Sequence, residues 1–311
     1  MKKHLARLVF VAPLMALTAV AQPAARPVGV PEAYVITPFG YFHPSCVRYV
    51  ADGEELLADG RIRHVNGTED AAAPVCQYPR YSAQGALIAA DNTSELTPVT
   101  NGWVESVSTV APSSYGKLVA TWKTPPAPTV NSGQTLFFFP GFEDITNVQS
   151  IVQPVLQWGP SAAGGGSFWA LSSWNCCLSG IADFSPLISV STGDPILGAI
   201  TPTCTPGLNC ATWNVVSEDR NTGARTVLRK TPSKGQTWNW AFGAVAEVYS
   251  VIQCANYPNN NGVTFNVRLY DQNLALIASP AWTKNAATGV TPNCGFGLNS
   301  TATQETVRYQ P

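Results

Sequence analysis

The sequence has 311 residues, of which only 12% are charged, and it carries 25 glycines and 25 prolines. Few charges and many turn-forming residues are typical of a chain of short strands, and they argue against a helical bundle. The formal net charge is −1. It argues against binding to nucleic acid, which requires a basic face.

The N-terminus has the pattern of a secretory signal peptide. Lys2, Lys3 and Arg7 precede a short apolar run, and Ala-Val-Ala precedes Gln22. We therefore expect residues 1–21 to be a signal peptide and the mature protein to be extracellular. No later segment approaches about 18 consecutive apolar residues, so we expect no membrane span.

The region that follows differs in composition from the rest of the chain. Residues 22–100 contain no tryptophan, whereas all nine tryptophans lie between Trp103 and Trp282. Proline and glycine interrupt the pattern at residues 95–102. We expect an accessory or propeptide-like region over 22–100, followed by one large domain over 101–311.

Apolar and β-branched runs recur through that domain, separated by turn residues. They predict strands over 102–110, 116–124, 135–141, 150–159, 167–174, 187–194, 195–201, 211–219, 224–230, 240–252, 262–271 and 274–282. About a dozen strands with short polar connections indicate an all-β sandwich of two sheets rather than alternating strands and helices.

Eight cysteines follow the predicted signal peptide, an even number that favours disulfides in an exported protein. We expect the local pairs Cys46–Cys76 and Cys204–Cys210. The pairing of the other four, which are Cys176, Cys177, Cys254 and Cys294, stays open. No Cys-x-x-Cys motif occurs, so we expect neither a metal nor another cofactor.

Carboxylates are the acid–base groups that the sequence leaves for catalysis. After the signal peptide the only histidines are His43 and His64, so a histidine-based site within 101–311 would need one of them to reach across. Glu247 lies among apolar and aromatic neighbours, where burial would raise its pKa. It is either a general base or acid, or a structural strand residue. Glu143 and Asp144 form a second acidic cluster, which could equally cap a loop.

Two glutamines share one face of the strand predicted over 150–159. Gln153 and Gln157 are four residues apart, and on a strand they lie on the same face as Ile151 and Val155. A buried amide must be hydrogen-bonded or it destabilises the fold. These amides are therefore either a satisfied structural pair or groups that contact a substrate.

Several segments in the same order resemble one family of secreted enzymes. They are "GKLVATWKTPPAP", "GFEDITNVQSIVQPVLQWG", "FWALSSW", "ISVSTGDPILGAI", "AFGAVAEVYSV" and "GVTFNV". Over roughly residues 101–275 the chain resembles the eqolisins, which are acid peptidases with a glutamine–glutamate dyad on a lectin-like, concanavalin A-like double β-sandwich. It departs from that family in lacking acidic residues in the "FWALSSWNCC" segment.

The resemblance implies a role for individual residues. Glu247 would be the general base and Gln153, ten residues after Glu143, the donor to the oxyanion; Gln157 is the alternative to Gln153. Trp169, Glu143 and Gln157 would contact substrate. The expected protein is a monomeric glutamic endopeptidase that acts on polypeptides in acid and binds neither nucleic acid nor membranes.

Two other classes of protein remain compatible with the sequence. A non-catalytic carbohydrate-binding module would use Trp158, Trp169 or Trp174 in a groove. A glycoside hydrolase would need two facing carboxylates, which only Glu247 with Glu143 or Asp144 could supply.

Overall fold

The computed structural model describes residues 26–88, 102–146, 150–177 and 180–311. The predicted signal peptide lies outside the described residues. Of the expected boundary at 95–102, only Gly102 is described.

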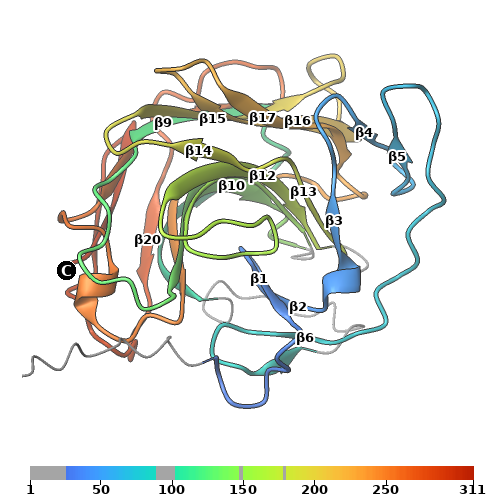
Figure 1. Ribbon diagram of the computed structural model, residues 1–311. Coiled ribbons are helices and arrows are strands. Elements are labelled where there is room, and N and C mark those ends of the chain that lie inside the picture. Colours follow the sequence, from blue (N-terminus) through green and yellow to red (C-terminus); the bar gives the residue numbers. More distant parts are fainter. Residues whose placement is uncertain (1–25, 89–101, 147–149, 178–179) are drawn as a thin grey trace, which may run out of the picture.

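Two nine-stranded sheets stack on each other, as the all-β sandwich prediction requires (Figure 1). The inner sheet has the order β20 (Thr283–Ala286), β8 (Trp103–Val110), β18 (Trp240–Tyr249), β10 (Thr135–Glu143), β11 (Ile151–Trp158), β12 (Trp169–Cys176), β13 (Ala182–Phe184) and β3 (Val47–Tyr49), and β14 (Ile188–Val190) also pairs with β12. The outer sheet has the order β21 (Gly297–Ser300), β22 (Gln304–Arg308), β19 (Val263–Tyr270), β9 (Lys117–Lys123), β15 (Pro195–Pro202), β16 (Thr212–Asp219), β17 (Arg225–Pro232), β4 (Glu55–Leu56) and β5 (Ile62–Arg63).

Residues 26–88, which we call the cover segment, form a third layer. Four short strands make a small sheet in the order β1 (Val35–Thr37), β2 (Gly40–Phe42), β6 (Arg80–Tyr81) and β7 (Leu87–Ile88). In Figure 1 these strands lie on the side of the inner sheet away from the outer sheet. The cover segment also extends both large sheets, because β3 pairs with β13 and β4 pairs with β17.

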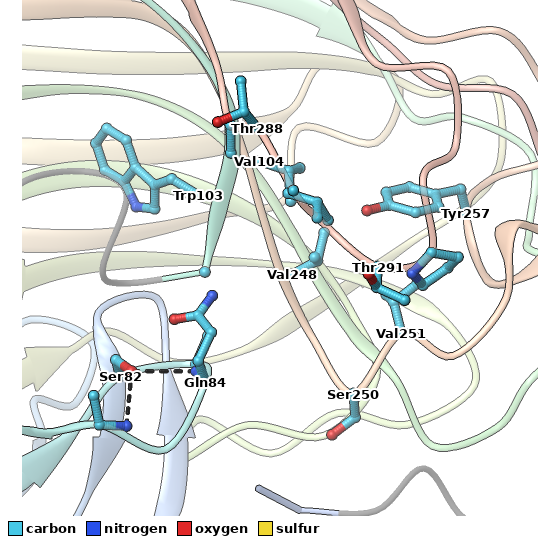
Figure 2. Close-up of a pocket in the computed structure, with 17 residues that line it drawn as sticks. Ser82, Gln84, Trp103, Val104, Val248, Ser250, Val251, Tyr257, Thr288 and Thr291 are labelled. Atoms are coloured by element: carbon cyan, nitrogen blue, oxygen red, sulfur yellow. Dashed lines mark hydrogen bonds between the residues drawn. The ribbon is translucent and has the colours of Figure 1, made fainter.

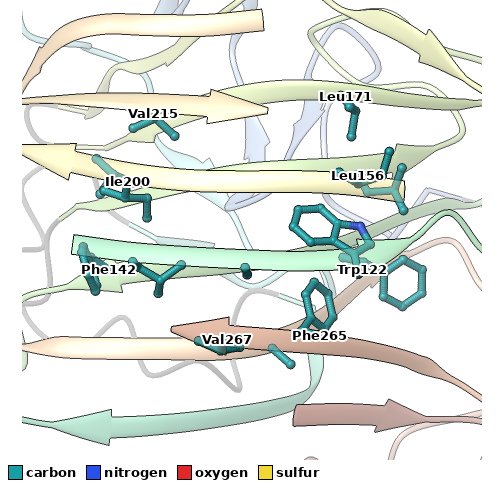
Figure 3. Packing of buried hydrophobic residues seen from close by; sticks show 14 of the residues in the cluster. Trp122, Phe142, Leu156, Leu171, Ile200, Val215, Phe265 and Val267 are labelled. Atoms are coloured by element: carbon teal, nitrogen blue, oxygen red, sulfur yellow. The ribbon is translucent and has the colours of Figure 1, made fainter. Parts of the chain in front are cut away.

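The main core fills the space between the two large sheets. Figure 3 shows Trp122 and Phe265 from the outer sheet near Leu156 from the inner sheet, with Phe142 of the inner sheet at the other end of the same core. These side chains are buried, as alternation along each strand requires for the face that meets the other sheet.

A second core covers the opposite face of the inner sheet. Phe137, Phe139 and Phe242 on that face pack in one cluster with Phe39 and Tyr41 of the cover segment. The inner sheet is therefore buried on both faces, and every residue of β10 and β11 is buried. Continuous apolar runs such as "LFFF" in β10 reflect this burial.

One predicted strand is wrong and several strands were not predicted. The run 274–282 forms no regular strand, since Leu274 adopts a left-handed φ of +64° and Pro280 interrupts the run. Leu276 is 56% exposed, so its apolar character does not reflect burial. The short strands β13, β20 and β21 escaped prediction because they carry little alternation, and β22 escaped it because one of its two buried residues is the charged Glu305.

Four disulfides join all eight cysteines. Cys46–Cys76 and Cys204–Cys210 confirm the two predicted local pairs. The remaining four cysteines pair as Cys176–Cys177, which are adjacent in sequence, and Cys254–Cys294. Within the described ranges no helix is long and apolar enough to cross a membrane.

Replacing Cys46 and Cys76 together with serine should loosen the cover segment. Their bond spans 30 residues. Closing a loop of that length stabilises a fold by about 3.6 kcal/mol through the entropy of the unfolded chain. Chemical denaturation should show a loss of that size. A Cys204–Cys210 double replacement is the control, because its shorter loop should cost less.

Candidate active site

The site lies on the face of the inner sheet that meets the cover segment. Strand register places Gln157, Phe137 and Glu247 opposite one another across β11, β10 and β18. Directly opposed residues share one face, so the side chains of Gln157 and Glu247 are on the same side with Phe137 between them. The two strands that carry them are separated by β10 and are not neighbours.

Gln153 is on the same face but farther along the strand. It is four residues from Gln157, a displacement of about 13 Å. Glu143 pairs with Ile151, two residues from Gln153, so Glu143 is the diagonal neighbour of Gln153 across β10 and β11. By register, Gln153 is therefore closer to Glu143 than to Glu247.

Gln153 holds a peptide carbonyl. Its side chain is fully buried, and Nε2 donates a hydrogen bond of 3.1 Å to the carbonyl oxygen of Pro38 in the cover segment. Its Oε1 is buried and has no hydrogen-bond partner among the described residues. One end of this amide thus contacts a peptide group, while the other end is unsatisfied.

Gln157 has a different role in this structure. Its Nε2 donates to the carbonyls of Gly159 and Gly164 at 2.8 and 2.9 Å, and its Oε1 accepts a bond of 2.8 Å from Ser161. A side chain at Gly165 would bring a Cβ within 2.4 Å of Nε2. Gln157 is therefore the buried anchor of the loop over 159–166.

Glu247 is a fully buried carboxyl with two donors. Trp103 Nε1 donates to Oε2 at 3.0 Å, and the hydroxyl of Tyr249 donates to Oε1. Burial raises the pKa of Glu247 well above its usual value, the two hydrogen bonds oppose that rise, and the charge of Glu143 adds to it. In the covered protein Glu247 is therefore protonated in acid.

Glu143 is the second buried carboxyl of this face. Burial raises its pKa well above the usual value, and its Oε2 has no hydrogen-bond partner within the described ranges. Asp144, in contrast, accepts bonds from the backbone of Thr146 at 3.0 Å and of Thr237 at 2.8 Å. Asp144 is therefore a loop cap, which is one of its two predicted roles.

The tryptophan near the glutamine is not the one that the sequence suggested. Trp169 pairs with Trp158 on the opposite face of the inner sheet and belongs to the core between the large sheets. Its assignment to substrate binding is therefore corrected, because alternation along β12 points it away from Gln153. Trp174 is directly opposite Gln153, and its indole nitrogen is buried without a partner in the described part of the chain.

The cover segment presents a stretch of main chain to these side chains. Pro38 offers its carbonyl to Gln153, and two residues later the backbone N–H of Gly40 donates to the hydroxyl of Tyr249 at 2.7 Å. The same hydroxyl bonds to Glu247. Gln153 directly and Glu247 through Tyr249 thus contact one short peptide stretch.

A cavity of about 590 Å³ is lined by Trp103, whose indole donates a hydrogen bond to Glu247, while Glu247 itself does not line the cavity (Figure 2). Its walls include Val104 and Val248 of the inner sheet and Ser82 of the cover segment. Ser82 Oγ accepts bonds from the backbone of Gln84 and Ala86, which fixes that turn. Among the described residues, no group of three or more potential ligands could hold a metal ion.

Two further buried glutamates make the fold sensitive to alkali. Burial raises the pKa of Glu105 to about 8 and that of Glu305 to about 7, from 4.5. Between pH 4.5 and these raised pKa values, the folded state keeps protons on the two glutamates that the unfolded state has released. The free energy of unfolding therefore falls as pH rises from about 4.5 to 8.

We expect the free energy of unfolding to drop by several kcal/mol over that range, on the order of 4 kcal/mol from Glu105 alone. Denaturant titrations at pH 4, 6 and 8 measure the drop. Glu105→Gln should flatten the pH dependence, and an equally steep dependence in that variant would exclude Glu105 as its source.

Comparison of the sequence with protein-family models and with curated proteins finds no match. Solved structures similar to this chain include scytalido-glutamic peptidase with a peptide-based transition-state analogue, at a TM-score of 0.48 and 16% identity, covering 67% of this chain and 98% of that one. SCP-B, a member of the eqolisin family in complex with the tripeptide Ala-Ile-His, gives a TM-score of 0.46 at 16% identity, with the same coverage of 67% and 98%. Aspergilloglutamic peptidase from Aspergillus niger gives 0.34 at 12% identity, covering 56% and 98%. The similar structures thus include a member of the family that the sequence resembles.

Proposed function

We propose that this protein is a secreted endopeptidase of the glutamic type, held latent by its own cover segment. The observation that carries the proposal is the peptide held against the inner sheet. An amide Nε2 bonds the carbonyl of Pro38, and a tyrosine bonded to Glu247 accepts from the N–H of Gly40. A face that binds a peptide carbonyl through an uncharged amide donor, beside a carboxyl, has the parts needed to hydrolyse peptide bonds.

In the proposed reaction Glu247, once ionised, removes a proton from water, and the water attacks the peptide carbonyl. Gln153 donates to the oxyanion that forms, and it can do so in acid because an amide does not titrate there. The protonated Glu247 then gives its proton to the leaving amine. Glu143 and Trp174 lie beside Gln153 and would contact the substrate main chain.

The cover segment has to move before this reaction can occur. Water has no access to Glu247 while that side chain is fully buried, and burial keeps it protonated in acid. Removal of the cover would hydrate the carboxyl and lower its pKa toward the acid range. We propose that the uncovered enzyme is active below neutral pH, and that the cavity beside Trp103 then takes an apolar side chain of the substrate.

A glycoside hydrolase is the second candidate, because Glu143 and Glu247 are two buried carboxyls on one face. A polysaccharide substrate assayed beside a denatured protein separates the two functions. The carbohydrate-binding module is disfavoured, since Trp158, Trp169 and Trp174 are at most 5% exposed and offer no stacking platform.

Alanine at the two glutamines should separate catalysis from architecture. Gln153→Ala removes the donor and should lower turnover of a denatured protein about 10²–10³-fold. It also removes the bond to Pro38, which loosens the cover, so a fall in activity cannot result from tighter closure. Gln157→Ala loses the three loop bonds and should lower the free energy of unfolding by about 1–3 kcal/mol with a smaller effect on turnover. The reverse pattern would assign the oxyanion donor to Gln157.

A further inference from the structure

A second cavity, of about 390 Å³, lies where the cover segment meets the outer side of the sandwich. Arg48 and Gly60 of the cover segment form one wall, and Ser233 and Lys234 in the turn after β17 form another. It is separate from the site of Gln153 and Glu247, and no residue is shared between the two.

Two cations that line the cavity share one buried carboxylate. Arg48 Nη2 and Lys234 Nζ both approach Asp183, at 2.7 Å from Oδ1 and 3.7 Å from Oδ2. One buried carboxylate thus faces two cations. Asp59 also lines the cavity, but its carboxylate is bound by Arg61 Nε at 2.7 Å.

The ammonium of Lys234 is poorly compensated by Asp183. A separation of 3.7 Å is too long for a hydrogen bond, and Asp183 Oδ2 has no hydrogen-bond partner in the described ranges. The Lys234 side chain is only 10% exposed. Burial lowers the pKa of Lys234 even though Asp183 opposes that change. An ammonium has three donors, so it retains the capacity to bind another acceptor.

Lys234 occupies the first central position of a turn that requires positive φ at both central residues. Lys234 has φ +54° and Gly235 has φ +79°, and the turn is closed by a bond of 2.9 Å from Gln236 N to Ser233 O. Glycine, asparagine or aspartate suit the first of these positions, and a lysine costs roughly 1 kcal/mol there.

We propose that this cavity binds a small oxyanion, either a carboxylate or a phosphate, through Lys234 and the adjacent charge of Arg48. The bound anion would complete the charge balance of the two cations with Asp183. Because Arg48 belongs to the cover segment and Lys234 to the sandwich, the anion would also strengthen the attachment of the cover.

Thermal unfolding and calorimetry of the full chain test the proposal, with inorganic phosphate and with acetate as probes against chloride at equal ionic strength. The unfolding midpoint should rise with the concentration of at least one probe, as expected for a ligand that binds only the folded state. Lys234→Met should lower the affinity for that probe at least 10-fold. Lys230→Met is the matched control and should bind normally, because Lys230 has a similar φ of +51° but an exposed ammonium paired with Glu55.

A second variant keeps the test decisive if Lys234→Met folds poorly. Ala73→Phe fills the cavity without changing its charges, and it should also abolish the response to the probe. No response of the wild type to either probe beyond that to chloride would overturn the proposal. An unchanged affinity in both Lys234→Met and Ala73→Phe would also overturn it.

Discussion

Replacing Glu247 with glutamine is expected to abolish peptide-bond hydrolysis while leaving the fold intact. The substitution preserves the size of the side chain, and the amide can stay bonded on both sides: its oxygen accepts from Trp103, and its NH2 donates to the hydroxyl oxygen of Tyr249. Glutamine cannot take a proton from water, so the variant lacks the general base. Loss of a general base costs about 10²–10⁴-fold in turnover, so residual cleavage should fall to background in an endpoint assay.

Two other glutamates provide the controls for this variant. Glu105→Gln changes a buried carboxyl between the large sheets and should leave hydrolysis unchanged at acid pH. Glu143→Gln changes the diagonal neighbour of Gln153 and should weaken substrate binding more than turnover. Full loss in Glu143→Gln with retained activity in Glu247→Gln would transfer the role of base to Glu143.

Replacing Gly40 with alanine is expected to activate the protein. Gly40 has φ +113°, and an added Cβ would lie 2.5 Å from the carbonyl oxygen of Tyr81. Both the unfavourable φ and the clash destabilise the covered conformation, in which the Gly40 N–H donates to Tyr249. A penalty of about 1.4 kcal/mol or more on the covered state increases the uncovered fraction at least about ten-fold, and activity should rise in proportion.

The control for activation is Gly67→Ala. Gly67 belongs to the same segment and has φ +84°, but no atom lies within 4 Å of its added Cβ. This variant should share the backbone strain without disturbing the inner sheet, so its activity should match that of the wild type. If Gly40→Ala is no more active than Gly67→Ala, the cover segment does not control access to the face.

The sandwich and its local disulfides were predictable because the information is local. Turn residues delimit strands such as β16 and β19, whose residues alternate between buried and less buried positions. The pairs Cys46–Cys76 and Cys204–Cys210 join cysteines that are close in sequence. Glu247 was identifiable because a charged residue among apolar neighbours stands out in any strand.

The arrangement of the site was less accessible to sequence reasoning. Trp169 and Trp174 both occur in one apolar strand, and only the register with β11 decides that Trp174 faces Gln153. The composition of the cover segment set it apart from the sandwich, but composition does not reveal which surface it covers. Phe39 and Tyr41 pack against the inner sheet in the second core, and this contact is visible only in the structure.

The double variant Gly40→Ala/Glu247→Gln decides whether Glu247 hydrolyses peptides on this face, because it opens the face and removes the proposed base at once. Hydrolysis of a denatured protein would be measured from pH 2 to 7 for this variant, for Gly40→Ala and for the wild type. We expect weak cleavage by the wild type and at least ten-fold stronger cleavage by Gly40→Ala, with its maximum below pH 7. We expect no cleavage by the double variant. Cleavage by the double variant at the level of Gly40→Ala would contradict the assignment of this face and of Glu247 to peptide hydrolysis.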